Sequence, residues 1–186
     1  ADGRVVGFEA LARWRSAERG LVPPIEFVGV AEQSDLIRAI DTVILERAWR
    51  QLDAALDACP YPEVNAVLSV NLSASHFIDS AIVERVQALL AEGRGRASRL
   101  QFEITETLLI NNTEAAEEIL GRLKALGVSI AMDDFGTGYS SLVYLHQFPI
   151  DCLKVDRSFS KLIVRSERSQ AIVRSIITLA QSMGLR

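Results

Sequence analysis

The sequence predicts an α/β fold in which helices cover a parallel sheet. Two observations predict it: five short runs of β-branched and apolar residues are spread along the 186 residues, and a segment with helical spacing of apolar residues follows each run. Strands that alternate with helices form a parallel sheet, either an open doubly wound sheet or a (β/α) barrel. No repeat, linker or low-complexity segment interrupts this alternation, so we expect one domain.

The expected strands are the apolar runs that turns or prolines bound. They lie at residues 5–11, 66–71, 100–105, 128–134 and 151–155. The fourth run ends in two adjacent carboxylates, Asp133 and Asp134, and Gly136 and Gly138 follow them.

The expected helices show apolar residues at helical spacing and residues that favour helix ends. Pro23 and Pro24 begin a short helix, because proline is tolerated in a first helical turn. Asn112 is expected to cap a later helix that Gly127 ends, and Gly184 to end the last one. The helices are expected at about residues 23–33, 36–58, 80–92, 113–126, 140–147 and 167–183. The apolar stripe of the second consists of Leu36, Ile40, Val43, Ile44, Ala48, Leu52, Ala55 and Leu56, and Pro60 and Pro62 follow it.

Composition excludes several classes of function. The formal net charge of −4 gives no basic footprint for a long nucleic acid. Cys59 and Cys152 are too few for a disulfide framework, which favours a reducing compartment, and we expect the cytoplasm. His76 and His146 are too few for a His-rich zinc site and are expected on helix surfaces or at caps. The sequence contains neither a signal peptide nor an apolar run of bilayer length.

Every expected strand ends in a polar or charged residue, and these are Glu9, Asn71, Glu103, Asp133 and Lys154. Strand side chains alternate in direction, so residues two positions earlier share the same face. Those neighbours are small or polar: Gly7, Ser69, Gln101, Ala131 and Cys152. The other face carries large apolar residues such as Phe8, which suit packing against outer helices. This pattern favours a barrel with its site at the C-terminal rim, although an open sheet also binds ligands beyond its strand ends.

The polar residues at the strand ends favour a hard metal ion. The candidate ligands all offer oxygen: Glu9, Asn71, Glu103, Asp133 and Asp134. Such ligands suit Mg²⁺ or Mn²⁺, and a carboxylate such as Asp133 can bridge two ions. Paired divalent ions serve the hydrolysis of phosphate esters, in which Lys154 could position water or neutralise phosphate charge. For Asp133, Asp134 and the glycines and serines after them, the structural alternative is a helix cap and a turn, because Asp, Gly and Ser favour both.

Five segments resemble, in order, the motifs of EAL-domain proteins, the cyclic-di-GMP phosphodiesterases. They are Gly7-Phe-Glu-Ala-Leu-Ala-Arg-Trp14, Asn71-Leu-Ser73, Glu103-Ile-Thr-Glu106, Asp133-Asp-Phe-Gly-Thr-Gly-Tyr-Ser-Ser-Leu142 and Lys154-Val-Asp156. The resemblance covers essentially the whole chain. It implies a TIM-type (β/α) barrel that hydrolyses cyclic-di-GMP to linear pGpG with Mg²⁺ or Mn²⁺ at a two-metal site.

The resemblance also implies a role for individual residues. The implied metal ligands are Glu9, Asn71, Glu103, Asp133 and Asp134. Lys154 is implied to hold the catalytic water, and Arg13 to contact substrate phosphate. Glu106 is implied to anchor the loop after Asp134, which in this family is also linked to homodimerisation, and Asp156 is implied to lie beside the substrate. Two plain structural alternatives remain open: Glu106 as a structural hydrogen-bonding group, and Arg13 as an exposed loop arginine.

The sequence departs from the family pattern at both ends. The family has a Tyr-Gln-Pro strand before the Glu9 segment, and it continues past Arg186 into an Ala-Glu-Gly-Val-Glu segment whose first glutamate is a general-base candidate. We therefore expect residues 1–186 to be an EAL domain fragment with about five strand–helix units. It would lack the first and last strands, leave both sheet edges unpaired, and show little activity alone.

Two other functions fit the same residues. A degenerate EAL domain would bind cyclic-di-GMP without cleaving it, and an interaction scaffold would keep only the fold. The intact carboxylates argue against degeneration. The general-base glutamate that the family has after the position of Arg186 is not in this sequence, so the matter stays open. Metal-dependent formation of pGpG would identify an enzyme, and the lack of any nucleotide affinity with Mn²⁺ present would identify a scaffold.

Overall fold

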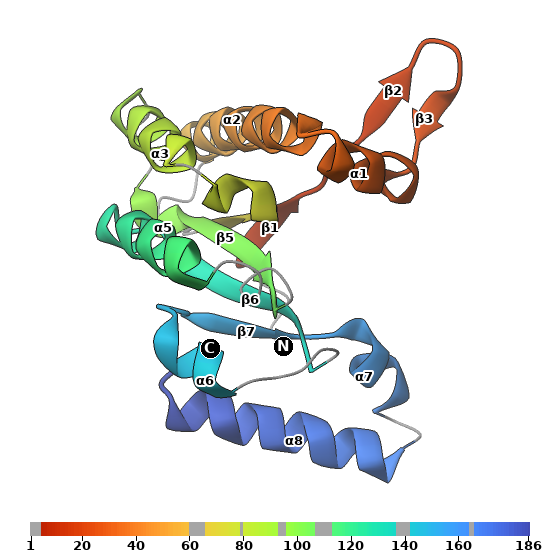
Figure 1. The fold of residues 1–186 in the computed structure, drawn as a ribbon, viewed down its shortest axis with the longest axis vertical. Coiled ribbons are helices and arrows are strands. Elements are labelled where there is room, and N and C mark those ends of the chain that lie inside the picture. The colour runs from red at the N-terminus through yellow and green to blue at the C-terminus, as the bar shows by residue number, and fades with distance from the viewer. Residues whose placement is uncertain are drawn as a thin grey trace.

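The computed structural model describes residues 5–59, 66–78, 80–92, 96–106, 113–136, 142–163 and 166–186. Its centre is a five-stranded parallel sheet with the order β1-β4-β5-β6-β7 (Figure 1). The strands are β1 (Gly7–Ala10), β4 (Val67–Asn71), β5 (Leu100–Thr105), β6 (Ser129–Phe135) and β7 (Cys152–Val155). All five expected strands are present; β5 has the predicted bounds, and the boundaries of the others shift by no more than two residues.

The strand order distinguishes the two folds that the sequence left open. Each strand of the sheet pairs with the next strand of that sheet along the chain, and all these pairings are parallel. An open doubly wound sheet reverses its order at a switch point, and this sheet does not. The described residues therefore form part of a TIM-type (β/α) barrel, as predicted.

Helices cover the outer side of the sheet and follow one another around it (Figure 1). They are α1 (Pro24–Gln33), α2 (Leu36–Asp57), α3 (Ala81–Glu92), α5 (Thr113–Ala125), α6 (Leu142–Gln147), α7 (Arg157–Leu162) and α8 (Glu167–Ser182), with short 3₁₀ helices η1 (Ala74–Phe77) and η2 (Ala97–Arg99). The core lies between these helices and the large residues of β5 and β6, including Phe102, Ile130 and Met132. Among the described residues, no helix combines the length and apolar character that crossing a bilayer requires.

Some elements are absent from the sequence predictions. The hairpin of β2 (Trp14–Ser16) and β3 (Gly20–Val22) projects from the barrel beyond α1, and α7 follows β7 directly (Figure 1). The expected roles of Pro60, Pro62 and Asn112 fall on residues outside the described ranges.

Three expectations about burial are wrong. Phe8 is 56% exposed instead of packing beneath an outer helix. His76 is only 3% exposed, so it is not a surface residue. The stripe of α2 is rotated by one position, because Leu36 and Val43 are exposed. The buried residues of α2 are Ile37, Asp41, Leu45, Trp49 and Leu52.

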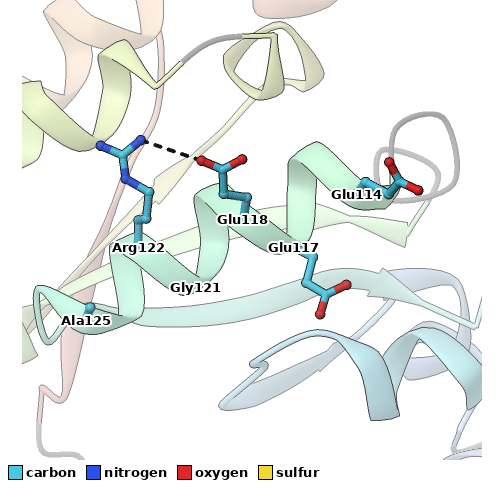
Figure 2. Close-up of a pocket in the computed structure, with 6 residues that line it drawn as sticks. All are labelled: Glu114, Glu117, Glu118, Gly121, Arg122 and Ala125. Carbon is cyan, nitrogen blue, oxygen red and sulfur yellow. Dashed lines mark ion pairs between the residues drawn. The ribbon is translucent and has the colours of Figure 1, made fainter.

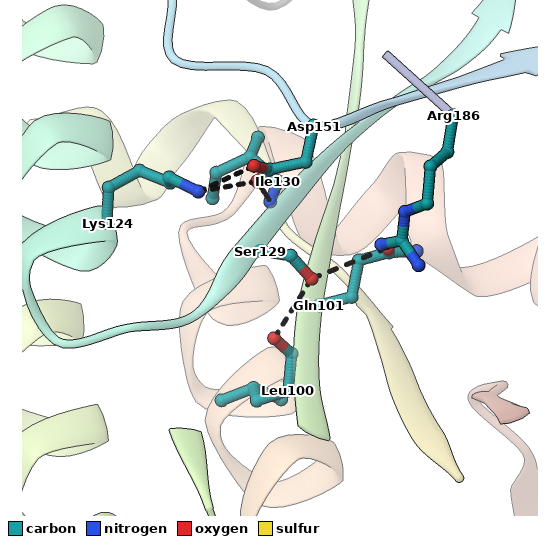
Figure 3. Close-up of polar contacts among 7 residues, drawn as sticks. All are labelled: Leu100, Gln101, Lys124, Ser129, Ile130, Asp151 and Arg186. Atoms are coloured by element: carbon teal, nitrogen blue, oxygen red, sulfur yellow. Dashed lines mark hydrogen bonds and ion pairs between the residues drawn. The ribbon is translucent and has the colours of Figure 1, made fainter. Parts of the chain in front are cut away.

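Polar contacts tie the sheet together at the end opposite the rim (Figure 3). The Lys124 ammonium of α5 donates to both carboxylate oxygens of Asp151, at 2.6 and 2.8 Å. Asp151 precedes β7, and its Oδ2 accepts the backbone N–H of Ile130 in β6 at 2.8 Å. Nearby, Arg186 approaches the side chain of Gln101 at 3.5 Å. These contacts fix α5, β6 and β7 relative to one another, and they are structural.

The close approach of β1 to β4 depends on the glycine at the start of β1. A Cβ added at Gly7 would lie 2.5 Å from the backbone oxygen of Val67. We predict that Gly7→Ala lowers the free energy of unfolding by roughly 1–3 kcal/mol, the usual cost of overpacking. Urea unfolding measures this change.

Gly29→Ala is the matched control, because Gly29 lies within α1 and nothing stands within 4 Å of the added Cβ. It is expected to be neutral or stabilising by up to about 1 kcal/mol, since alanine favours helices. Equal destabilisation by both substitutions would contradict the close approach.

Candidate functional site

The backbone register brings the predicted strand-end residues to one face of the sheet. Asn71 pairs with Glu103, and Glu103 pairs in turn with Ala131. Glu9 pairs with Ser69, two residues before Asn71, while Asp133 pairs with Thr105, two residues after Glu103. This stagger is the shear that strand tilt produces in a barrel, so the candidate residues climb around the rim from β1 to β6.

Side-chain contacts link these residues in two groups, Glu9 with Asn71 and Lys154 with Glu103 and Asp133. Asn71 Nδ2 donates to Glu9 Oε1 at 3.3 Å. Lys154 Nζ donates to Glu103 Oε2 at 2.6 Å and lies 3.5 Å from Asp133 Oδ2. The structure therefore assembles five predicted residues from five different strands, with the ammonium of β7 between the carboxylates of β5 and β6. We call Glu9, Asn71, Glu103, Asp133 and Lys154 the rim cluster.

Glu103 is the most buried residue of the rim cluster, and Lys154 pairs with it. Glu103 is 2% exposed, and a buried carboxylate is costly unless a cation or hydrogen-bond donors meet it. Burial by itself would lower the pKa of Lys154, but the hydrogen bond and charge of Glu103 outweigh this effect. Together with the charges of Asp133 and Glu9, they raise the pKa of Lys154 above its ordinary value of 10.5. The lysine therefore remains a cation.

Asp134 and Asp156 form a second acidic pair next to the rim cluster. The backbone of Asp134 is left-handed, with φ of 54°, which turns its side chain away from the strand alternation. Partial burial, the charge of Asp133, and the charge and hydrogen bond of Asp156 raise the pKa of Asp134. Asp156 caps α7 by accepting the N–H of Ser158 at 2.9 Å, and hydrogen bonding to Ser158 lowers the pKa of Asp156.

A cavity of about 600 Å³ opens beside the rim cluster. Asn71 and Glu103 contribute to its wall from the strands, and Arg13 contributes from the loop after β1. Helices α1 and α2 form the rest of the wall, together with the Leu72–Ser75 segment. The sequence predictions do not include Asp41, because it lies within helix α2 and not at a strand end. The sequence signal that could have indicated Asp41 is its helical spacing from the apolar residues Ile37 and Leu45.

Glu106 follows β5 and is buried, in keeping with a structural or anchoring role. It is not among the residues that line the cavity. The loop that it was expected to anchor includes residues 137–141, which lie outside the described ranges. Anchoring of that loop and homodimerisation through it therefore stay predictions.

A second depression lies on the outer surface of α5, away from the strand ends (Figure 2). Its residues project from successive turns of one helix, and Arg122 lies 4.0 Å from Glu118. Glu117 points toward α6, where it accepts a hydrogen bond from Gln147 at 2.9 Å. Its lining within the described part of the chain includes none of the predicted strand-end residues.

The acidic side chains at the rim have the chemistry of a hard-cation site. All the predicted ligands offer oxygen, and carboxylates outnumber the single ammonium that contacts Glu103 and Asp133. Within the described part of the chain, no three Asp, Glu, His or Cys residues are grouped closely enough to hold one ion. Lys154 compensates the acidic charge in the present arrangement.

Comparison with known proteins gives a consistent picture. The family model described as the EAL domain matches residues 1–186. The cyclic di-GMP phosphodiesterase NbdA of Pseudomonas aeruginosa is 41% identical over 100% of this chain and 23% of its own length. The cyclic di-GMP phosphodiesterase PdeR of Escherichia coli is 39% identical over 99% of this chain and 27% of its own length. The chain thus spans about a quarter of these curated relatives.

Solved structures support the same fold. A PaMucR phosphodiesterase in complex with c-di-GMP superposes with a TM-score of 0.88 and 37% identity, covering 99% of this chain and 73% of that one. The EAL enzyme Bd1971, in a form that binds cAMP and cyclic-di-GMP, gives a TM-score of 0.91 and 33% identity, covering 100% of this chain and 50% of that one.

Removal of the Lys154 charge should expose the cost of the buried carboxylate. We predict that Lys154→Met lowers the free energy of unfolding by about 2 kcal/mol in the presence of EDTA, because Glu103 is left buried and unpaired. This figure is below the roughly 3–5 kcal/mol of fully buried pairs, since the Lys154 side chain is 32% exposed. Glu103→Gln combined with Lys154→Met should recover most of the loss in urea unfolding. A double variant no more stable than the single one would contradict the pairing.

The raised pKa of Asp134 predicts a pH-dependent effect of Asp134→Asn. The folded protein binds the Asp134 proton more tightly than the unfolded chain, whose pKa is near 3.8. Asp134 therefore contributes stability at low pH that is lost as pH rises through its folded-state pKa. We expect Asp134→Asn to raise the Tm in EDTA at pH 7, by an amount that shrinks as pH falls toward 3.8.

Asp35→Asn controls for the preference of asparagine for left-handed backbone, because Asp35 has a φ of 56°. A Tm gain at pH 7 that is no larger for Asp134→Asn than for Asp35→Asn would show that backbone preference explains the effect. The electrostatic account of Asp134 would then be wrong.

Proposed function

Since the chain belongs to the EAL domain family, we propose that the full-length protein hydrolyses cyclic-di-GMP to linear pGpG at this site. The observation that carries this proposal is the rim cluster, in which acidic and amide side chains from separate strands meet beside a cavity. The relatives NbdA and PdeR, which are named as cyclic di-GMP phosphodiesterases, support it.

The cavity and its charges suit a nucleotide substrate. Its volume of about 600 Å³ falls within the usual range for small-molecule sites, roughly 300–1,000 Å³. The Arg13 guanidinium in the wall is proposed to bind a substrate phosphate, because its planar donors match phosphate oxygens. The net charge of −4 makes such local cations necessary for an anionic ligand.

We propose Mg²⁺ or Mn²⁺ as the cofactor, in a two-metal site. The residues that would hold the ions are Glu9, Asn71, Glu103, Asp133 and Asp134. When bound, such ions supply an activated water and stabilise the charge that develops on the phosphate. These residues suit a divalent ion because they offer hard oxygen donors and carry negative charge that Lys154 compensates only in part.

The chain's own residues would orient the reacting groups. Lys154, held by Glu103, is proposed to position the water whose oxygen adds to phosphorus while the bond to a sugar oxygen breaks and that oxygen takes a proton. Asp156 would keep Asp134 in place, because their side chains share a hydrogen bond. Glu106 is proposed to anchor the loop after Asp134, through which the protein would form a homodimer.

We also propose a cytoplasmic location. The sequence has only two cysteines, Cys59 and Cys152, which are too few for a disulfide framework and suit a reducing compartment. A cytoplasmic site is also where a nucleotide substrate would be available to the rim cluster.

Metal-dependent turnover tests the proposed function. The full-length protein is expected to convert cyclic-di-GMP to pGpG with Mg²⁺ or Mn²⁺ and to stop when EDTA is added, as chromatography of the products would show. Glu9→Ala should reduce kcat by more than about 100-fold without unfolding the protein, since even partners outside the first coordination sphere are worth 10–100-fold. Glu18→Ala, at an exposed glutamate of the β2–β3 hairpin, is the matched control and should retain normal rates.

Two other results would overturn the proposal. Tight binding of cyclic-di-GMP without pGpG formation would identify a receptor. No affinity for the dinucleotide in the presence of Mn²⁺ would identify an interaction scaffold. Normal turnover by Glu9→Ala would refute the metal assignment.

A further inference from the structure

A buried aspartate joins helix α2 to the cavity wall. Asp41 is 9% exposed, and it lines the cavity together with Asn71 and Ser73. Its Oδ2 accepts the backbone N–H of Ser73 at 3.2 Å. Ser73 lies two residues after Asn71, so this hydrogen bond fixes the chain where it leaves the rim cluster.

The same carboxylate oxygen meets a buried histidine. His76 lies in η1, is 3% exposed, and places its Nε2 3.3 Å from Asp41 Oδ2. The His76 backbone N–H also donates to the Ser73 carbonyl at 3.2 Å. One oxygen of Asp41 therefore contacts both ends of a single turn, at the Ser73 amide and at the His76 ring.

Packing alone does not explain why a histidine occupies position 76. Its Nε2 is buried, and no hydrogen bond is aligned to it from the described residues. A buried polar atom in that condition is unfavourable, and an apolar side chain of similar shape would avoid the cost. The nearby Asp41 oxygen is the charged group that the ring contacts, which accounts for an imidazole at this position.

We infer that His76 is a positioning residue of the candidate site, acting through Asp41. The imidazole holds the Asp41 carboxylate in the cavity wall, and Asp41 in turn holds the Ser73–Ser75 segment beside the rim cluster. Ser73 and Ser75 are further joined by a hydrogen bond between their hydroxyls, at 2.9 Å. The effect on turnover rests on the proposed function, whereas the effect on the Ser73 amide does not.

Substitutions that keep or remove the ring nitrogen test this inference. His76→Leu removes it at similar volume, while His76→Gln places an amide nitrogen near the position of Nε2. In the full-length protein, we expect His76→Leu to raise the KM for cyclic-di-GMP about tenfold with a smaller change in kcat, the lower end for partners that orient site residues. His76→Gln should return the KM to within about threefold of wild type. His146→Leu, at an exposed histidine of α6, should change neither.

Hydrogen exchange at the Ser73 amide gives a readout that requires no activity. Exchange should be faster in His76→Leu than in His76→Gln or wild type, because the Asp41 acceptor is no longer held. If the leucine variant does not fold, His76→Asn replaces it, since its shorter amide cannot reach the position of Nε2.

Two outcomes would overturn the inference: unchanged Ser73 exchange and KM in His76→Leu, or equal impairment of the glutamine and leucine variants. If the wild-type protein did not hydrolyse cyclic-di-GMP, the proposed function would be wrong. The hydrogen-exchange rate of the Ser73 amide would still decide the role of His76.

Discussion

The hydrogen bond between the Lys154 ammonium and the Glu103 carboxylate, 2.6 Å long, is the interaction on which the site depends. Glu103 is placed in the interior of a sheet, where an uncompensated charge is very unfavourable. Lys154 reaches it because β5, β6 and β7 are parallel and end at the same edge. The same ammonium approaches Asp133, so one cation sets the spacing of two candidate ligands.

Much of the fold and the rim could be predicted because parallel strands repeat a simple rule. A strand with alternating faces that ends in a polar residue places that residue at the common edge, which is why the position of Glu9, Asn71 and Lys154 at this edge could be predicted from sequence. The outer face was harder to predict. Phe8 is apolar and was expected to be covered, yet nothing in its local sequence determines which helix packs over it.

Features that depend on tertiary contacts were missed for a physical reason. The strands of the β2–β3 hairpin are only three residues each, too short for a periodic pattern. In α2, Leu36 and Val43 fit the helical spacing of a buried stripe but are exposed. The residues that are buried include Asp41. Asp41 and His76 come from separate elements and approach each other only once α2 and η1 have packed. No local pattern in either segment indicates this pairing.

Anomalous diffraction from crystals of the protein with Mn²⁺ would test the central claim most directly, namely that the strand ends jointly hold divalent cations. We predict manganese peaks within about 2.6 Å of oxygens from at least three of Glu9, Asn71, Glu103, Asp133 and Asp134. Manganese bound only elsewhere, with Lys154 still bridging Glu103 and Asp133, would contradict the account.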